Sequence, residues 1–185
     1  LRRDARPVVE LLDRLVDAYR KIRNTFRFML SNVSDFEPAQ DTVSYEQLCA
    51  IDQWALHALA QMKTSAEKHY QAYNFLEVYK TLYAFCNETL SGIYLDILKD
   101  RLYTSAPKSS ERLSAQTVLC DILDVMIRLT APILTFTSQE VFEAMPRSQE
   151  LKRIANVHLL EWTPAPNVWD NEPLAKKYQF LLAMF

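Results

Sequence analysis

The chain has 185 residues, a hydrophobic fraction of 49%, a single glycine (Gly92) and a net charge of −2. One glycine is too few for a sheet joined by tight turns, for a glycine-rich phosphate loop or for a dinucleotide-binding fingerprint, because each of these needs positive φ or close backbone approach. A net charge near zero also excludes a protein that is basic over its whole surface, as bulk nucleic-acid binders are. We therefore expect an all-α protein of ordinary domain size.

The sequence also lacks the patterns of membrane-spanning proteins, metal sites and common catalytic sites. No apolar run approaches the ~20 residues of a membrane span, and no signal peptide precedes the first helical pattern. The three cysteines lack the spacing of metal ligands or redox pairs, so we expect reduced, buried thiols in a cytoplasmic protein. The three histidines are too scattered for a metal site, and no catalytic motif is present. We expect neither catalytic nor metal-binding residues, and a chain that acts by binding.

The first helix is expected over residues 7–32, because its apolar residues recur every three or four positions and predict one buried face. That face consists of Leu12, Leu15, Tyr19, Ile22, Phe26, Met29 and Val33. Residues 1–30 carry a local charge of +4. Arg20, Arg23 and Arg27 fall within about 60° of one another on the flank and back of the helix. This basic strip is interpreted either as a solvated helix face or as a surface that binds RNA.

A second helix is expected to open at Ser44, where Gln47 completes a capping box. Trp54 falls at the edge of its apolar stripe, and His57 points away from the stripe. If the basic strip binds RNA, exposed aromatic rings would supply stacking surfaces worth ~1–3 kcal/mol per base. Phe28 on the first helix and Trp54 on the second are the candidates. The alternative for each is packing against a neighbouring helix.

A third helical pattern runs from Phe75 to about Tyr103. Residues 87–92 interrupt it with weak helix formers, which predicts one kinked helix or two consecutive ones. Lys99 projects from the back of this pattern and would extend the basic surface. Arg101 leans toward the buried side, where we expect an ion pair or a bond to terminal carbonyls.

The remaining helices have recognisable starts and stops. Ser109 or Ser110 caps a fourth helix, which Pro132 ends. Thr137 and Glu140 form a capping box for a short fifth helix. Four long amphipathic segments joined by short loops predict a helix bundle.

We assign residues 1–147 to this bundle. Residues 148–185 are assigned to an extended segment (156–162), a Pro-rich link and the start of a C-terminal junction helix from about Asn171. The first and last residues lie inside helical patterns, as expected of a piece of a longer protein.

Six segments, in chain order, resemble the anticodon-binding domain of isoleucyl-tRNA synthetase of the bacterial or organellar type. They are residues 19–28 (YRKIRNTFRF), 51–56 (IDQWAL), 85–103 (FCNETLSGIYLDILKDRLY), 112–119 (RLSAQTVL), 129–137 (LTAPILTFT) and 157–159 (VHL). Together they span nearly all of residues 15 to 165. Any one of these matches is weak, but their common order makes the resemblance specific.

The resemblance implies an α-helical bundle that binds the anticodon stem-loop of tRNA(Ile). It implies a parent ligase that attaches isoleucine to tRNA and uses ATP, magnesium and zinc, in catalytic, editing and zinc-binding modules that lie outside these residues. No cofactor is therefore expected in this chain, and we expect a cytoplasmic monomer without membrane contact. The residues expected to contact tRNA are Arg20, Arg23, Asn24, Arg27, Phe28, Trp54 and Lys99.

Two alternatives stay open. One is the corresponding domain of valyl- or leucyl-tRNA synthetase. The other is a helical interaction module that binds no RNA, in which the basic strip would pair with an acidic protein.

Overall fold

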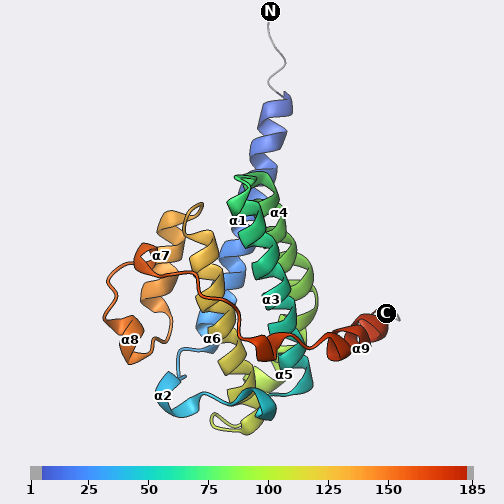
Figure 1. The fold of residues 1–185 in the computed structure, drawn as a ribbon, viewed down its shortest axis with the longest axis vertical. Helices are drawn as coiled ribbons and strands as arrows, with labels where there is room; N and C mark the ends of the chain where they lie inside the picture. Colours follow the sequence, from blue (N-terminus) through green and yellow to red (C-terminus); the bar gives the residue numbers. More distant parts are fainter. Residues whose placement is uncertain (1–5, 183–185) are drawn as a thin grey trace, which may run out of the picture.

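The computed structural model describes residues 6–182, apart from the side chains of residues 6–9 and 11. Helices make up the regular structure of these residues (Figure 1). Within these residues there is no strand, and the expected all-α helix bundle is confirmed. The long helical segments are α1 (Arg6–Asn32), α3 (Ala50–Gln71), α4 (Phe75–Ala84) with η2 (Phe85–Tyr94) and α5 (Leu95–Thr104), and α6 (Ser110–Thr130). The shorter elements are α2 (Pro38–Asp41), η1 (Tyr45–Gln47), α7 (Thr135–Ala144), α8 (Gln149–Lys152), η3 (Val157–Leu159), η4 (Asn167–Trp169) and α9 (Glu172–Leu182).

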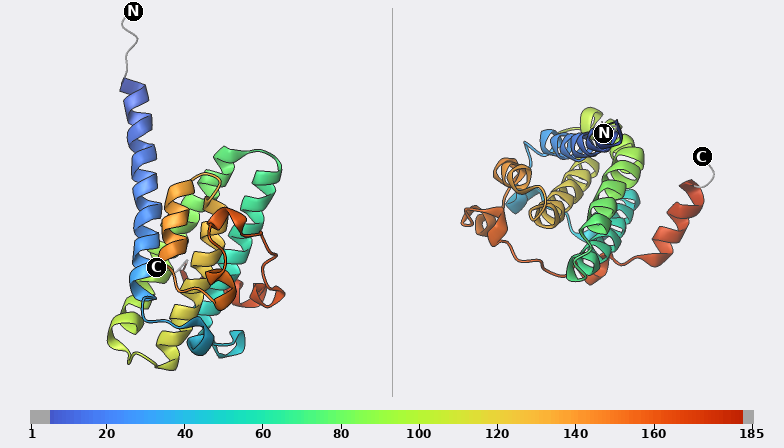
Figure 2. Two further views of the ribbon diagram at one scale, coloured as in Figure 1. Left: turned by 90° about the vertical axis from the view of Figure 1, so that its left-hand side faces the viewer. Right: turned by 90° about the horizontal axis from the view of Figure 1, so that it is seen from above.

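Helix α6 is the centre of the bundle. It packs against α1, α3, α5 and α7, and it runs through the middle of the molecule in Figures 1 and 2. Its sequence is apolar on more than one side, so it buries most of its circumference. The fully buried apolar residues of this helix are Ala115, Val118, Leu119, Ile122, Leu123, Met126 and Ile127.

Helix α1 belongs to the bundle only in its C-terminal half. Ile22, Phe26 and Met29 are buried there, as the periodicity predicts. The N-terminal half stands above the other helices (Figure 2), and Leu12 and Leu15 are 55% and 47% exposed. Their predicted burial is wrong, because the neighbouring helices leave this part of α1 uncovered. The predicted burial of Tyr19 is wrong too: the side chain is 39% exposed, although its hydroxyl bonds to Thr137 on α7.

The starts of the helices agree only partly with the sequence signals. Ser109 accepts a hydrogen bond from the backbone N–H of Arg112 and caps α6, as expected. Both predicted capping boxes are wrong. Ser44 precedes the short η1 turn and not a long helix, since α3 begins at Ala50. Thr137 lies inside α7, where its hydroxyl bonds to the hydroxyl of Tyr19 at 3.1 Å.

The third helical pattern is one continuous run from α4 through η2 to α5. Its middle part, η2, is π-helical, a wider winding that is rare and occurs frequently at functional sites. It contains the weak helix formers that predicted a break. A Cβ at Gly92 would lie 3.2 Å from the carbonyl oxygen of Asn87, so glycine suits the close backbone approach in this segment.

The end of the chain folds back over the bundle. The segment expected to be extended contains the η3 turn, and Val157 and Leu160 are buried in the same core as the long helices. Trp169 joins that core, and α9 packs against α3. The division of the chain after residue 147 stays a prediction.

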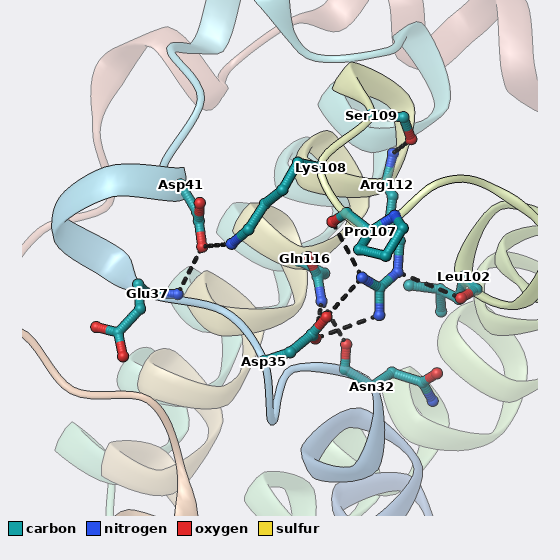
Figure 3. A network of polar contacts seen from close by, with 10 residues as sticks. All are labelled: Asn32, Asp35, Glu37, Asp41, Leu102, Pro107, Lys108, Ser109, Arg112 and Gln116. Atoms are coloured by element: carbon teal, nitrogen blue, oxygen red, sulfur yellow. Dashed lines mark hydrogen bonds and ion pairs between the residues drawn. The ribbon is translucent and has the colours of Figure 1, made fainter.

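A polar network fixes the loop that follows α1 to the start of α6 (Figure 3). Arg112 donates to both carboxylate oxygens of Asp35, at 2.6 and 3.2 Å. Gln116 donates to the carbonyl of Asn32 and to Asp35, at 2.9 and 2.7 Å. The hydrogen bond from Arg112, more than any other contact, holds the pKa of Asp35 below its usual value. The C-terminal end of α1 is thereby held in place.

The same network continues to the short helix α2. Lys108 donates to Asp41 at 2.6 Å, and the backbone N–H of Glu37 donates to the same carboxylate at 2.8 Å. The bond from Lys108 is the main cause that lowers the pKa of Asp41. The ion pairs Arg112–Asp35 and Lys108–Asp41 connect the segment after α1 to residues at and just before the start of α6. This part of the fold therefore depends on ionised carboxylates.

Candidate nucleic-acid interface

The bundled half of α1 buries one face and exposes the opposite one. Arg20, Arg23, Asn24 and Arg27 are exposed, and they lie opposite Ile22 and the other core residues. Thr25 faces the bundle, where its hydroxyl donates to the carbonyl of Lys21 at 2.9 Å. The three arginines therefore share an exposed face, as the helical spacing predicts.

The arginines differ in the partners they have. Arg20 is 3.3 Å from Asp17, in a pair whose side chains are 69% and 75% exposed, and such an exposed pair is weak. Among the residues whose side chains are described, Arg23 and Arg27 take part in no ion pair. A guanidinium without an internal partner is free to bind a phosphate with two parallel hydrogen bonds.

Arg23 and Arg27 border a hollow of about 470 Å³ between α1 and α7, which we name the α7-side hollow. Its other polar residues include Thr137 and Glu140, and Ala144 lies on its α7 wall. It is a shallow and open depression, suited to a backbone that crosses the surface and less suited to an enclosed small molecule.

A second hollow, of about 280 Å³, lies on the other side of α1 and is named the α5-side hollow. It brings together three residues expected to contact tRNA: Asn24, Phe28 and Lys99. Phe28 is partly buried and packs against the core. The residues that line this hollow are Lys21, Asn24, Thr25, Phe28, Ser91, Leu95, Asp96 and Lys99.

Lys99 does not stand alone in the α5-side hollow. It donates to Asp96 at 2.6 Å, and this hydrogen bond raises the pKa of Lys99. Asp96 and Ser91 are not among the site residues expected from the sequence. The spacing of Asp96 and Lys99 is typical of an ordinary helix-surface pair, and Ser91 meets α1 only through the tertiary fold, where its hydroxyl is 3.4 Å from that of Thr25.

Trp54 lies elsewhere and is not exposed. Only 8% of it is accessible, and its ring lies 5.7 Å from the ring of Tyr178 on α9. The predicted position of Trp54 at an exposed rim is therefore wrong. The side of α3 that carries His57, away from the apolar stripe, is covered as well: His57 is 8% exposed, and its Nδ1 accepts a hydrogen bond from the backbone N–H of Asn171 at 3.1 Å. The C-terminal segment covers both side chains.

A buried ion pair joins α5 to α3. The carboxylate of Asp52 on α3 is fully buried, and it accepts two hydrogen bonds from Arg101 at 3.0 and 2.6 Å. Tyr94 and Ser114 donate to the same carboxylate at 2.8 and 2.5 Å. Arg101 also donates to the carbonyl of Glu111. The expected ion pair of Arg101 is confirmed, whereas its carbonyl partner lies in the first turn of α6 and not at the end of a helix. The network joins α3, η2, α5 and α6.

Other chemistry finds no support in the described part of the chain. Within it, no group of three or more His, Cys, Asp or Glu side chains is arranged to hold a metal ion, so these residues do not fit the zinc or magnesium that the resemblance assigns to the parent. The three cysteines are free, and burial raises the pKa of Cys86 to about 12. None of the described helices is both long and apolar enough to cross a membrane.

Comparison with known proteins agrees with this geometry. The relatives that match this chain include three that bear the name isoleucine–tRNA ligase. The one from Syntrophotalea carbinolica is 43% identical over 181 residues, which is 98% of this chain and 19% of the relative. The one from Caldanaerobacter subterraneus is 40% identical over 96% of this chain and 19% of the relative. The one from Bordetella avium is 49% identical over 75% of this chain and 15% of the relative.

The chain therefore spans about a fifth of the length of the curated relatives that it matches. The family model described as the anticodon-binding domain of tRNA ligase matches residues 52–184. The match includes η2 and α5, which line the α5-side hollow, but not α1. From this match, and from the helix bundle with its exposed arginines, the chain belongs to the anticodon-binding domain family of tRNA ligases.

Proposed function

We propose that this chain is the anticodon-binding part of an isoleucine–tRNA ligase and that it binds the anticodon stem-loop of tRNA(Ile). The observation that carries the proposal is the exposed pair Arg23 and Arg27, which border an open hollow and have no ion-pair partner among the described residues. The names of the relatives support isoleucine over valine or leucine.

The physical roles follow from the positions of the side chains. Arg23 and Arg27 bind loop phosphates, because a guanidinium fork matches phosphate geometry. Arg20 adds positive charge at the N-terminal end of the same face. Asn24 and Phe28 lie at the α5-side hollow, where an amide can bond to a base edge and a partly exposed ring can stack on a base. Trp54 is assigned to the scaffold.

The parent's other properties are part of the same proposal. It attaches isoleucine to tRNA with ATP and uses magnesium and zinc in parts outside this chain, and it works as a monomer in the cytoplasm. No residue described in this structure is assigned to those steps.

The test is fluorescence anisotropy of a labelled isoleucine anticodon stem-loop across a salt series, with the chain and with Arg23→Ala and Arg27→Ala. Each variant should weaken binding about tenfold at low salt, a free-energy loss of about 1.4 kcal/mol. Each should also make the slope of log affinity against log salt less negative by about 0.7 to 0.9. The control is Arg153→Ala, at an exposed arginine that follows α8, which should change neither quantity.

Equal affinity and equal slope for the wild type and both arginine variants would contradict the assignment. Loops that carry valine or leucine anticodons test the sister ligases, and binding as tight as that of the isoleucine loop would contradict the choice of isoleucine. Competition by an acidic protein, but not by tRNA, would favour the non-RNA module.

A further inference from the structure

The α5-side hollow contains a negative charge that phosphate binding does not explain. Asp96 lies there on α5, beside Lys99 and across from Asn24 and Phe28 of α1. A carboxylate repels a phosphate, so Asp96 would weaken the binding of an RNA phosphate in this hollow. The residue types in this hollow instead suit a ligand that has both a flat apolar face and polar edges.

One oxygen of this carboxylate is unused. Lys99 donates to Oδ1 of Asp96 at 2.6 Å, while Oδ2 accepts no hydrogen bond from the residues that the structure describes. The Asp96 side chain is 67% exposed, so a ligand in the hollow can reach it. An ionised carboxylate only accepts hydrogen bonds, and the ligand must therefore present a donor.

Three neighbours limit what kind of donor fits. The ring of Phe28 is partly exposed in the wall of the hollow, where a planar group can stack on it. Asn24 offers an amide that both donates and accepts. The hydroxyl of Ser91 comes from η2, a π-helical segment of the kind that occurs frequently at functional sites. At about 280 Å³ the hollow is just below the usual range for small-ligand sites, which begins near ~300 Å³.

We propose that the α5-side hollow receives one unpaired base of the bound RNA loop and that Asp96 accepts a hydrogen bond from the exocyclic amino group of that base. Asp96 is then a specificity-determining residue, because a base without the amino group leaves its oxygen unpaired. Lys99 holds the carboxylate in position through Oδ1 and leaves Oδ2 for the base. This inference rests on the proposed function and names the base chemistry that the function requires.

The plain alternative is that Asp96 and Lys99 are an exposed ion pair three residues apart, of little consequence. The chain contains a matched pair for comparison. Glu77 and Lys80 on α4 have the same spacing and the same distance of 2.6 Å, with side chains 37% and 56% exposed, but they do not line the α5-side hollow. Glu77→Gln therefore removes an equivalent charge without touching the hollow.

The experiment uses isoleucine anticodon stem-loops in which the exocyclic amino group is deleted at one loop position at a time, with inosine for guanosine and purine riboside for adenosine. With the wild-type chain, one position should weaken binding roughly 5- to 100-fold. With Asp96→Asn, the unmodified loop should bind less tightly and the penalty at that one position should disappear. With Glu77→Gln, the wild-type pattern should be retained. An unchanged midpoint of thermal unfolding shows that the Asp96→Asn fold is intact.

Two results would overturn the inference. One is a pattern of penalties that is the same in the wild type and in Asp96→Asn. The other is tighter binding of every loop by Asp96→Asn, which would show that the carboxylate only repels the RNA. If the arginine variants lose affinity as expected while Asp96→Asn changes nothing, this inference alone fails. If no loop binds with salt dependence, the proposed function fails with it.

Discussion

Replacing Asp52 by asparagine should destabilise the fold more than any surface substitution on the same helices. The carboxylate is fully buried and accepts four hydrogen bonds, from Tyr94, from Ser114 and twice from Arg101. Its guanidinium partner is only 17% exposed. Removing one member of a buried ion pair leaves the other charge uncompensated, which costs about 3–5 kcal/mol. The whole domain is expected to have an unfolding free energy of roughly 5–15 kcal/mol.

Two observations show that the charge of Arg101 depends on its ion pair with Asp52. Burial would lower the pKa of Arg101, but the hydrogen bonds to Asp52 raise it. The Nε of Arg101 is buried and has no hydrogen-bond partner among the described residues, so the guanidinium depends on Asp52 all the more. The double variant Asp52→Asn/Arg101→Met should accordingly lose less stability than the two single variants together, by about 1–3 kcal/mol.

The assay is urea unfolding followed by far-ultraviolet circular dichroism, with linear extrapolation to water and a check that the slope is unchanged. Asp100→Asn is the control, because Asp100 is exposed on the same helix as Arg101 and should change stability by less than about 0.5 kcal/mol. A loss below about 1 kcal/mol for Asp52→Asn, or strict additivity in the double variant, would refute the reasoning.

Three further expectations concern other parts of the bundle. Arg112→Met should lower the free energy of unfolding by about 1–3 kcal/mol, measured by urea unfolding, because Asp35 loses both hydrogen bonds from that side chain; a loss below about 0.5 kcal/mol would contradict this. Burial, with a smaller effect of Asp124, raises the pKa of Asp121 to about 7. The folded state therefore keeps a proton that the unfolded chain releases near pH 4, and stability falls as pH rises between those values. Asp121→Asn should thus stabilise the protein more at pH 8 than at pH 5, and equal effects at both values would count against the raised pKa. Trp54→Leu should cost about 1–3 kcal/mol and leave stem-loop affinity within twofold, whereas a tenfold loss of affinity would restore Trp54 to the interface.

The periodicity of α1 could be predicted correctly because it is local. The spacing of Ile22 and Phe26 determines which side of the helix is apolar, and the arginines then fall on the opposite side. How far the neighbouring helices reach along α1 is a tertiary property. For this reason Leu12 and Leu15 follow the same pattern and are exposed.

Long-range contacts explain the other differences. Trp54 and His57 are covered by residues more than a hundred positions away, on α9 and just before it. Thr137 matches a capping box, but its hydroxyl bonds to Tyr19. A capping signal identifies a residue that can cap a helix, and the tertiary fold decides whether it does.

The candidate site likewise contains residues that could be predicted from one helix and a residue that only the tertiary fold identifies. The arginines could be predicted from one helix, and Lys99 could be placed on a second helical surface. Asp96 could not be identified, because its spacing to Lys99 is that of an ordinary surface pair and only the tertiary fold brings it into one hollow with Asn24 and Phe28.

The central claim is that the exposed face of α1 binds the anticodon stem-loop. Its most direct test is the dissociation constant of the isoleucine stem-loop for Arg23→Ala/Arg27→Ala, compared with that for the wild type and Arg153→Ala at low salt. If the face binds the stem-loop, the double variant should bind about a hundredfold more weakly, from about 1.4 kcal/mol per arginine, and Arg153→Ala should bind as the wild type does. A double variant that binds as tightly as the wild type would contradict the claim.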